Sequence, residues 1–260
     1  MALVAALALA YGWLEAGWVR LRELEVRVEG LPDALDGLRV AHLSDFHLGL
    51  PSRGVLACER AVAWVAERQP DLVCVTGDLL SRASGEARLR ALLEQLGHPY
   101  VVLGNHDVAV SRDPFSRAVE LRALEHGIVL SDTSDVVDAR GESVELAGVD
   151  PRSWVAKRPS GFAEPVASLR ILLCHFPEVL DRVPDGRWHL ILSGHLHAGQ
   201  IALPYGKGRL LLAHPRARYA QGLYRRGRTV MHVSPGLGTT FVPFRFFARP
   251  EATELVLRCG

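Results

Sequence analysis

Short apolar segments of the chain end, again and again, in polar residues of the kinds that bind metal ions. Apolar runs of four to six residues bounded by turn residues are typical of buried strands. In α/β folds, sites form at the edge where the carboxyl ends of the strands meet. The chain contains five such runs, and we therefore expect the polar residues that follow them to gather in one place. The runs are Leu38–Leu43, Leu72–Val75, Tyr100–Leu103, Leu169–Cys174 and Trp188–Leu192.

The segments between and after these runs indicate the fold class. Helical spacing of apolar residues predicts helices over Leu56–Arg68, Glu86–Leu96 and Pro114–His126. An alternation of strand and helix followed by a strand-rich half predicts two packed sheets flanked by helices. We expect an α+β, four-layer αββα sandwich with two mixed sheets, formed by a single domain over residues 21–260. Further strands are expected at Glu23–Glu29, Ile128–Leu130, Val136–Asp138, Ser143–Val149, Thr229–Val233 and Glu254–Leu257.

The charge balance argues against a nucleic-acid partner. Lys and Arg number 30 against 29 for Asp and Glu, a formal net charge of +1, whereas nucleic-acid binders usually carry a strong basic excess. The four cysteines form no CxxC pair, and Cys74 and Cys174 lie in strand-like runs. Such cysteines pack as small apolar residues. Their spacing suits a chain that does not rely on disulfides, which favours a reducing compartment without excluding export.

The N-terminus is strongly apolar. Residues 1–14 carry no charged side chain, and Glu15 interrupts the run before Ala16–Val19. At about 1.5 Å per helical residue, residues 1–14 are too short for a hydrocarbon core of roughly 30 Å, and a span is feasible only with Glu15 near one end. Basic residues follow this segment, and basic flanks tend to stay cytoplasmic. They are Arg20, Arg22 and Arg27.

We therefore expect residues 1–20 to associate with a membrane surface and to leave the catalytic domain on the cytoplasmic face. Two alternatives remain. Ala8–Ala10 resembles the cleavage site of a secretory signal, but the basic region that precedes such signals is missing. The segment is also compatible with an ordinary helix packed on the domain.

The residues at the strand ends are two carboxylates, four imidazoles and one amide, with no thiolate among them. Such ligands suit Mn, Fe, Zn or Co better than Ca. Seven ligands are too many for one such ion, so we expect two divalent ions that share a carboxylate, Mn²⁺ first, with Zn²⁺, Fe or Mg²⁺ as alternatives. The expected ligands are Asp45, His47, Asp78, Asn105, His175, His195 and His197.

Two ions about 3.5–4 Å apart clamp a phosphoryl oxygen and generate a bridging hydroxide for in-line attack. A histidine oriented by a carboxylate would stabilise the phosphoryl oxygens or protonate the leaving group. His106 and Asp107 directly follow Asn105 and fit these two positions.

The ordered motifs resemble the five blocks of the calcineurin-like metallophosphoesterase family. They are Asp45-Phe46-His47, Gly77-Asp78, Gly104-Asn105-His106-Asp107, a lone His175 and Gly194-His195-Leu196-His197. The resemblance extends over residues 35–260 and implies a β-sandwich flanked by helices. It assigns Asp45, His47 and His197 to one metal. It assigns Asn105, His175 and His195 to the other, with Asp78 bridging both. It also implies that His106 contacts the phosphoryl group and that Asp107 supports His106.

Further features are similar to the YkuE/YaeI-type branch of this family. They are Leu35–Val40, Gly199-Gln200, Gly236–Thr239, Pro250-Glu251 and the apolar N-terminus, whereas Ala198 stands where that branch usually has Gly. The resemblance implies hydrolysis of a phosphodiester, phosphomonoester or pyrophosphate, with a lipid-linked or cell-envelope substrate as one candidate. The alternatives are a UDP-2,3-diacylglucosamine pyrophosphatase of lipid A synthesis and a non-catalytic binding scaffold on the same fold.

The remaining polar and aromatic clusters are expected to be structural. Arginines at positions 209–228 are typical of a solvated hairpin face, with an anionic-lipid surface as the alternative. For Phe241–Phe247 core packing is expected, with an acyl pocket or a bilayer contact as the alternatives. Six histidines are expected to have no role in the site: His42, His98, His126, His189, His214 and His232.

Overall fold

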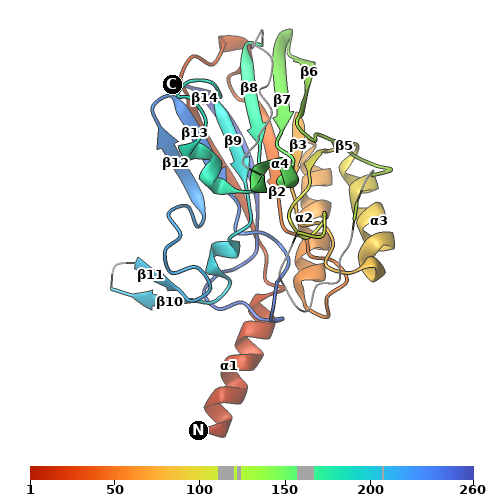
Figure 1. Ribbon diagram of the computed structural model, residues 1–260, viewed down its shortest axis with the longest axis vertical. Coiled ribbons are helices and arrows are strands. Elements are labelled where there is room, and N and C mark those ends of the chain that lie inside the picture. The colour runs from red at the N-terminus through yellow and green to blue at the C-terminus, as the bar shows by residue number, and fades with distance from the viewer. Residues whose placement is uncertain (111–119, 122–123, 157–166, 207) are drawn as a thin grey trace.

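Two six-stranded mixed sheets pack face to face in the computed structural model (Figure 1), which describes residues 1–110, 120–121, 124–156, 167–206 and 208–260. The first sheet has the order β1-β14-β2-β3-β4-β5, and the second has the order β12-β13-β9-β8-β7-β6. In the first sheet only the β14–β2 pair is antiparallel. The strands of the first sheet are β1 (Arg20–Val28), β2 (Arg39–Leu43), β3 (Leu72–Thr76), β4 (Tyr100–Val102), β5 (Ile128–Val129) and β14 (Glu251–Cys259).

The second sheet is parallel in its centre and antiparallel at both edges. Its strands are β6 (Thr133–Ala139), β7 (Glu142–Gly148), β8 (Leu169–Leu173), β9 (Leu190–Ser193), β12 (Gly222–Arg226) and β13 (Thr229–Val233). A separate hairpin, β10 (Ala202–Tyr205) and β11 (Gly208–Leu211), extends beside the sandwich.

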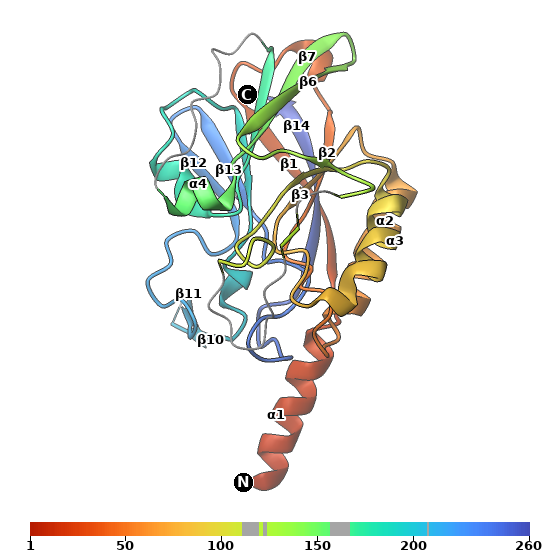
Figure 2. The same cartoon turned by 45° about the vertical axis from the view of Figure 1, so that its right-hand side comes forward.

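Alternation of side chains along the strands produces three apolar layers. On β2, Val40 faces the core between the sheets, whereas Ala41 and Leu43 face the helices. The helices α2 (Gly54–Arg68) and α3 (Glu86–Leu96) cover the outer face of the first sheet (Figure 2). The outer face of the second sheet packs against α4 (Pro151–Val155) and a 3-10 turn at Pro177–Asp181. The four-layer sandwich expected from the sequence is thus confirmed.

The N-terminal helix α1 (Ala2–Glu15) projects from one end of the sandwich (Figures 1 and 2). Only Gly12 and Glu15 of this helix are buried. The carboxylate of Glu15 is fully buried and accepts hydrogen bonds from the backbone N–H groups of Phe247 at 3.0 Å and Ala248 at 2.7 Å. Glu15, which interrupts the apolar run, therefore fixes the helix to the domain. Among the described residues, no helix is long and apolar enough to cross a membrane.

Two expectations about local structure need comment. Most of the helix expected at Pro114–His126 lies outside the described residues. In the described part of this segment Glu120 pairs with Val108 in an isolated β-bridge and His126 lies in a turn. The prediction that Phe241–Phe247 packs in the core is wrong in part, because Phe241 is 53% exposed and Phe247 is 44% exposed.

Candidate metal centre

The expected ligands lie on loops that directly follow five strands, β2, β3, β4, β8 and β9, at one end of the sandwich. Five of the seven have left-handed backbone conformations, with φ of 54° at Asp45, 47° at His47, 54° at Asp78, 78° at His195 and 49° at His197. Such φ values are uncommon outside glycine and concentrate at functional sites, where surrounding contacts must maintain them. The chain thus turns sharply at each strand end and directs the side chains inward.

Two motif glycines permit the close approach of these loops. A Cβ at Gly104 would overlap the carboxylate of Asp78, and a Cβ at Gly194 would overlap Ser44 and the carboxylate of Asp45. The glycines of the Gly-Asn-His-Asp and Gly-His-Leu-His motifs are therefore required for the ligands to converge.

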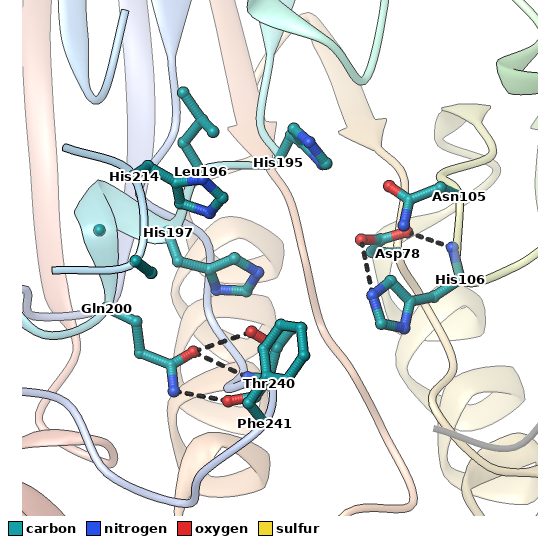
Figure 3. A pocket seen from close by; sticks show the side chains of 12 residues that line it. Asp78, Asn105, His106, His195, Leu196, His197, Gln200, His214, Thr240 and Phe241 are labelled. Carbon is teal, nitrogen blue, oxygen red and sulfur yellow. Dashed lines mark hydrogen bonds and ion pairs between the residues drawn. The ribbon is translucent and has the colours of Figure 1, made fainter. Parts of the chain in front are cut away.

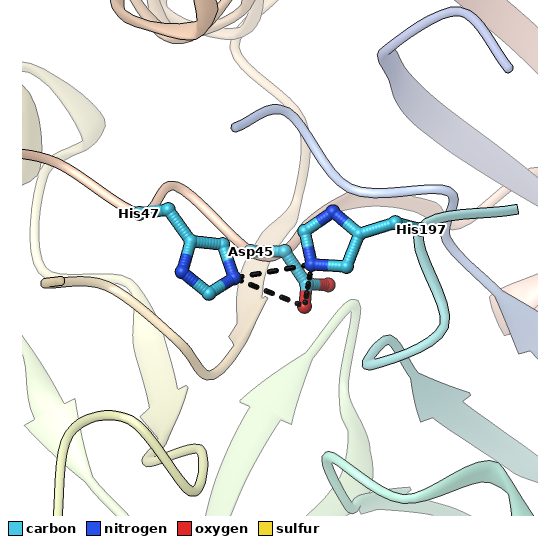
Figure 4. A group of neighbouring side chains, drawn as sticks. All are labelled: Asp45, His47 and His197. Atoms are coloured by element: carbon cyan, nitrogen blue, oxygen red, sulfur yellow. Dashed lines mark hydrogen bonds and ion pairs between the residues drawn. The ribbon is translucent and has the colours of Figure 1, made fainter. Parts of the chain in front are cut away.

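One group of donors consists of Asp45, His47 and His197 (Figure 4). The Nε2 atoms of the two histidines are 3.1 Å apart. Asp45 Oδ1 lies 3.3 Å from His197 Nε2 and 3.9 Å from His47 Nε2. Three buried nitrogen and oxygen atoms thus face a common point.

A second group consists of Asp78, His175 and His195. His175 Nε2 lies 3.2 Å from Asp78 Oδ2 and 3.1 Å from His195 Nδ1. The same Asp78 Oδ2 lies 3.5 Å from His47 Nε2, so this carboxylate stands between the two groups. Asn105 Oδ1 is buried and accepts no hydrogen bond from the described residues. An orphaned carbonyl oxygen beside these atoms fits a metal ligand.

The geometry and electrostatics of the donors fit two metal ions. Two ligands at about 2.1 Å from one ion lie about 3.0–3.4 Å apart at tetrahedral or octahedral angles, close to the shortest separations within both groups. Burial alone would lower the pKa of His175, but the nearby carboxylate of Asp78 overrides burial and raises the pKa to about 10. In the same group burial lowers the pKa of His195 to about 3, so its imidazole is neutral at pH 7 and keeps a lone pair for a metal ion.

Hydrogen bonds to the far side of the imidazoles orient them. The carbonyl oxygen of Thr76 accepts from His175 Nδ1 at 2.8 Å, which leaves His175 Nε2 unprotonated and facing the donors when the ring is neutral. Ser81 Oγ lies 2.8 Å from His47 Nδ1. The guanidinium of the fully buried Arg245 lies 3.2 Å from His197 Nδ1.

A pocket of about 170 Å³ opens onto these donors. Figure 3 shows Asp78, Asn105 and His106 across the pocket from His197 and Gln200. The His106 ring packs edge-on against His47 with 4.7 Å between centroids, and its Nε2 lies 3.9 Å from Asp78 Oδ2. His106 thus reaches the pocket beside both groups, as a residue that contacts substrate must.

Asp107 has a different environment from the one expected. Its carboxylate is fully buried and accepts from the backbone N–H groups of Leu79 at 2.8 Å, Leu80 at 3.0 Å and Gly104 at 2.9 Å. These bonds tie the loop after β3 to the loop after β4. The structure therefore shows Asp107 positioning the backbone that carries Asp78 and Asn105, while its support of His106 stays a prediction.

Three residues near the donors were not among the expected site residues. His214, expected to lie away from the site, lines the pocket with its ring centroid 6.4 Å from that of His195. Phe241 forms part of the same wall. Arg245 lies behind His197. None of the three follows an apolar strand, so the pattern that revealed the ligands carried no signal for them. His42, in contrast, is a buried strand histidine hydrogen-bonded to Thr76 and His232, as expected.

The comparisons with known proteins agree with this geometry. The model of the calcineurin-like phosphoesterase family matches residues 38–199, more than half of the chain. The chain therefore belongs to the calcineurin-like phosphoesterase family and is, by class, a hydrolase of phosphoric esters.

Three relatives are similar to this chain over nearly its whole length. A protein of Danio rerio described as a transmembrane protein with metallophosphoesterase domain is 33% identical over 98% of this chain, and the chain spans 61% of its length. Phosphodiesterase YaeI of Escherichia coli is 26% identical over 94% of this chain and 90% of the relative. UDP-2,3-diacylglucosamine pyrophosphatase LpxG of Chlamydia muridarum is 26% identical over 99% of this chain and 95% of the relative. The match to YaeI supports the branch inferred from the sequence.

Proposed function

We propose that this chain hydrolyses phosphoric esters with two divalent metal ions, phosphodiesters being the first candidate substrates. The observation that carries the proposal is the convergence of two buried donor groups on a shared carboxylate, Asp78. Asp45, His47 and His197 would hold one ion, and Asn105, His175 and His195 would hold the other. When bound, two such ions polarise a phosphoryl group and activate water.

The residues around the donors have separate tasks. His106 lines the pocket beside Asp78, where its ring would donate to a phosphoryl oxygen or protonate the leaving group. Asp107 ties the loop after β3 to the loop after β4 by accepting hydrogen bonds from three backbone N–H groups. His214 and Thr240 border the same pocket and would contact the ester substituents.

A hydrolysis panel tests the proposal. Nitrophenyl monoesters, nitrophenyl diesters and pyrophosphate esters are each assayed with Mn²⁺, Zn²⁺, Mg²⁺ and Fe²⁺, and metal content is measured on the same protein. We expect two ions per chain and turnover that Asp78→Asn or His195→Ala abolishes while the circular dichroism spectrum is retained. His98→Ala, at an exposed histidine, serves as the control.

Full activity of Asp78→Asn with metal present would refute this mechanism. Fewer than one ion per chain and no hydrolysis with added Mn²⁺ would instead support the non-catalytic scaffold.

A lipid-linked pyrophosphate is the second candidate substrate. It is favoured by the similarity to LpxG and by the exposed apolar surface of α1. Turnover of UDP-2,3-diacylglucosamine without cleavage of nitrophenyl diesters would select this function over the first.

We further propose that residues 1–20 attach residues 21–260, the catalytic domain, to the cytoplasmic face of a membrane. On α1, Leu3 is 72% exposed, Leu7 is 61% exposed and Leu14 is 56% exposed. The 14 residues of α1 extend about 21 Å, less than a hydrocarbon core of roughly 30 Å, so the helix would enter a single leaflet. Trp18, next to the helix, stacks under Arg249 at 4.0 Å, a pair suited to the interface.

Cell fractionation of the full chain and of a variant without residues 1–20 tests this attachment. We expect the full chain in the membrane fraction and the shortened chain outside it. Equal partitioning of the two forms would contradict the proposal.

A further inference from the structure

A second cavity, of about 310 Å³, adjoins the catalytic pocket. Its walls are mainly apolar. They are formed by Leu50, Pro51, Phe241, Val242 and Pro243, with Thr239 and Arg82 as the polar members. Phe241 lines both cavities. The groove formed by these residues, hereafter the apolar groove, therefore shares a wall with the pocket that opens onto the metal donors.

Both walls of the apolar groove are fixed to loops that carry metal ligands. Leu50 lies three residues after His47. On the other wall the buried Gln200, three residues after His197, donates from its side-chain nitrogen to the carbonyls of Thr240 at 2.6 Å and Val242 at 2.9 Å. Its side-chain oxygen accepts from the backbone N–H of Thr240 at 2.8 Å. The groove is thus a built extension of the site.

The apolar groove also lies beside the N-terminal helix. The aromatic residues that follow Pro243 pack on α1, with ring centroids 6.3 Å apart for Trp13 and Phe244 and 6.2 Å apart for Tyr11 and Phe246. The exposed residues Phe241 and Val242 therefore directly precede a segment that packs on α1.

We propose that the apolar groove binds the hydrocarbon portion of an amphiphilic phosphoester whose phosphoryl group lies at the metal donors. The inference rests on the proposed function and names its substrate class. Phe241, at the junction, would contact the atoms that join the phosphoryl group to the chain. Walls built from Leu, Pro, Val and Phe favour methylene groups over polar substituents, because a buried polar group without a partner is costly.

The apolar surface at Phe241 and Val242 supports a hydrocarbon occupant. Val242 is 37% exposed and Phe241 is 53% exposed, more than core packing would leave. Burying one methylene group typically improves binding by up to about fourfold. A chain of several methylenes would thus raise kcat/KM by one to two orders of magnitude, mainly through KM.

A chain-length series tests the inference. Alkyl p-nitrophenyl phosphates from methyl to octyl are assayed as dispersed monomers with Mn²⁺, so that no membrane or micelle contributes. We expect kcat/KM to rise by about two- to fourfold per methylene over the first members. Val242→Ser and the groove-filling Val242→Trp should bring the octyl-to-methyl ratio close to one. Val136→Ser, at a 59% exposed valine on β6, should keep the wild-type ratio.

Each result is decisive. A rising series that both Val242 variants flatten supports the apolar groove as the chain site. Equal kcat/KM across the series, or a slope that Val242→Trp leaves intact, overturns this inference while the proposed function stands. Failure to hydrolyse any of the alkyl esters overturns this inference, and together with no turnover of any ester in the hydrolysis panel or of UDP-2,3-diacylglucosamine it overturns the proposed function as well.

Discussion

A buried chain of hydrogen bonds ends on Asp45, a proposed metal ligand, and breaking this chain at Thr76 should weaken one of the proposed metal sites. His232 Nδ1 lies 2.8 Å from His42 Nδ1, and His42 Nε2 lies 2.8 Å from Thr76 Oγ1. Thr76 Oγ1 donates to Ser44 Oγ at 2.8 Å, and Ser44 Oγ donates to Asp45 Oδ2 at 2.5 Å. The chain runs between the two sheets and has no exposed member.

The direction of this chain follows from the charges of its members. Burial, and then His232, places the pKa of His42 well below its usual range, and burial and Arg22 lower that of His232 to about 3. Both rings are therefore neutral at pH 7. With His232 donating to His42 and His42 to Thr76, each hydrogen points toward Asp45 and stabilises its carboxylate.

Thr76→Val keeps the shape of the side chain and removes the oxygen. It leaves the Nε2–H of His42 without its acceptor and Ser44 without a donor, and each such buried group costs about 1–3 kcal/mol. We expect the free energy of unfolding of the metal-free protein to fall by about 2–4 kcal/mol. Because Asp45 loses its oriented partner, the affinity of one metal should fall about 10- to 100-fold.

Denaturant unfolding in EDTA and chelator-competition titration measure these two effects separately, since bound metal would otherwise contribute to stability. Thr229→Val is the matched control, because Thr229 is also buried and its hydroxyl donates to the carbonyl of Trp188 at 2.8 Å, outside the chain. We expect the control to lose only about 1 kcal/mol. The interpretation fails if both variants lose equal stability and bind both metals as the wild type does.

Two further predictions concern the rest of the domain. Glu15→Ala leaves the backbone N–H groups of Phe247 and Ala248 without their acceptor. The free energy of unfolding, measured in detergent, should therefore fall by about 2–4 kcal/mol. Glu29→Ala, at an exposed position, is the control and should leave that free energy nearly unchanged. Burial, then Arg170 and Arg228, lower the pKa of His189 to about 4. Between about pH 6.5 and 4 the unfolded chain therefore binds more protons than the folded chain. The free energy of unfolding should fall as the pH is lowered through that window, and less steeply in His189→Gln. Acid titration followed by fluorescence measures this difference.

The sequence predicts the clustering of the donor residues well because their signal is local. Each follows an apolar strand, and parallel neighbours such as β2, β3 and β4 bring their ends together by geometry alone. The layers follow from the same alternation of side chains. No comparable local pattern indicates that the C-terminal β14 inserts between β1 and β2, pairing Arg20 with Glu251.

Two residues show why the rest of the site could not be predicted. Arg245 is fully buried although arginine is rarely so. Its guanidinium is satisfied by the carbonyls of Pro235, Gly238 and Ala248, which the fold alone brings around it. His214 reaches the pocket from a segment without strand or helix periodicity. Both positions depend on tertiary packing that sequence spacing does not encode.

Arg245 also joins the N-terminal helix to the metal centre. Its backbone N–H donates to the carbonyl of Gly12 at 3.0 Å, while its guanidinium lies 3.2 Å from His197 Nδ1. A Cβ at Gly12 would overlap the ring of Phe246, so a larger residue at this position would have to displace that ring. Arg245 therefore contacts both α1 and the ring of His197, and displacing α1 would remove one of its hydrogen-bond partners. Membrane attachment through α1 would thus act on a residue that lies against a proposed metal ligand.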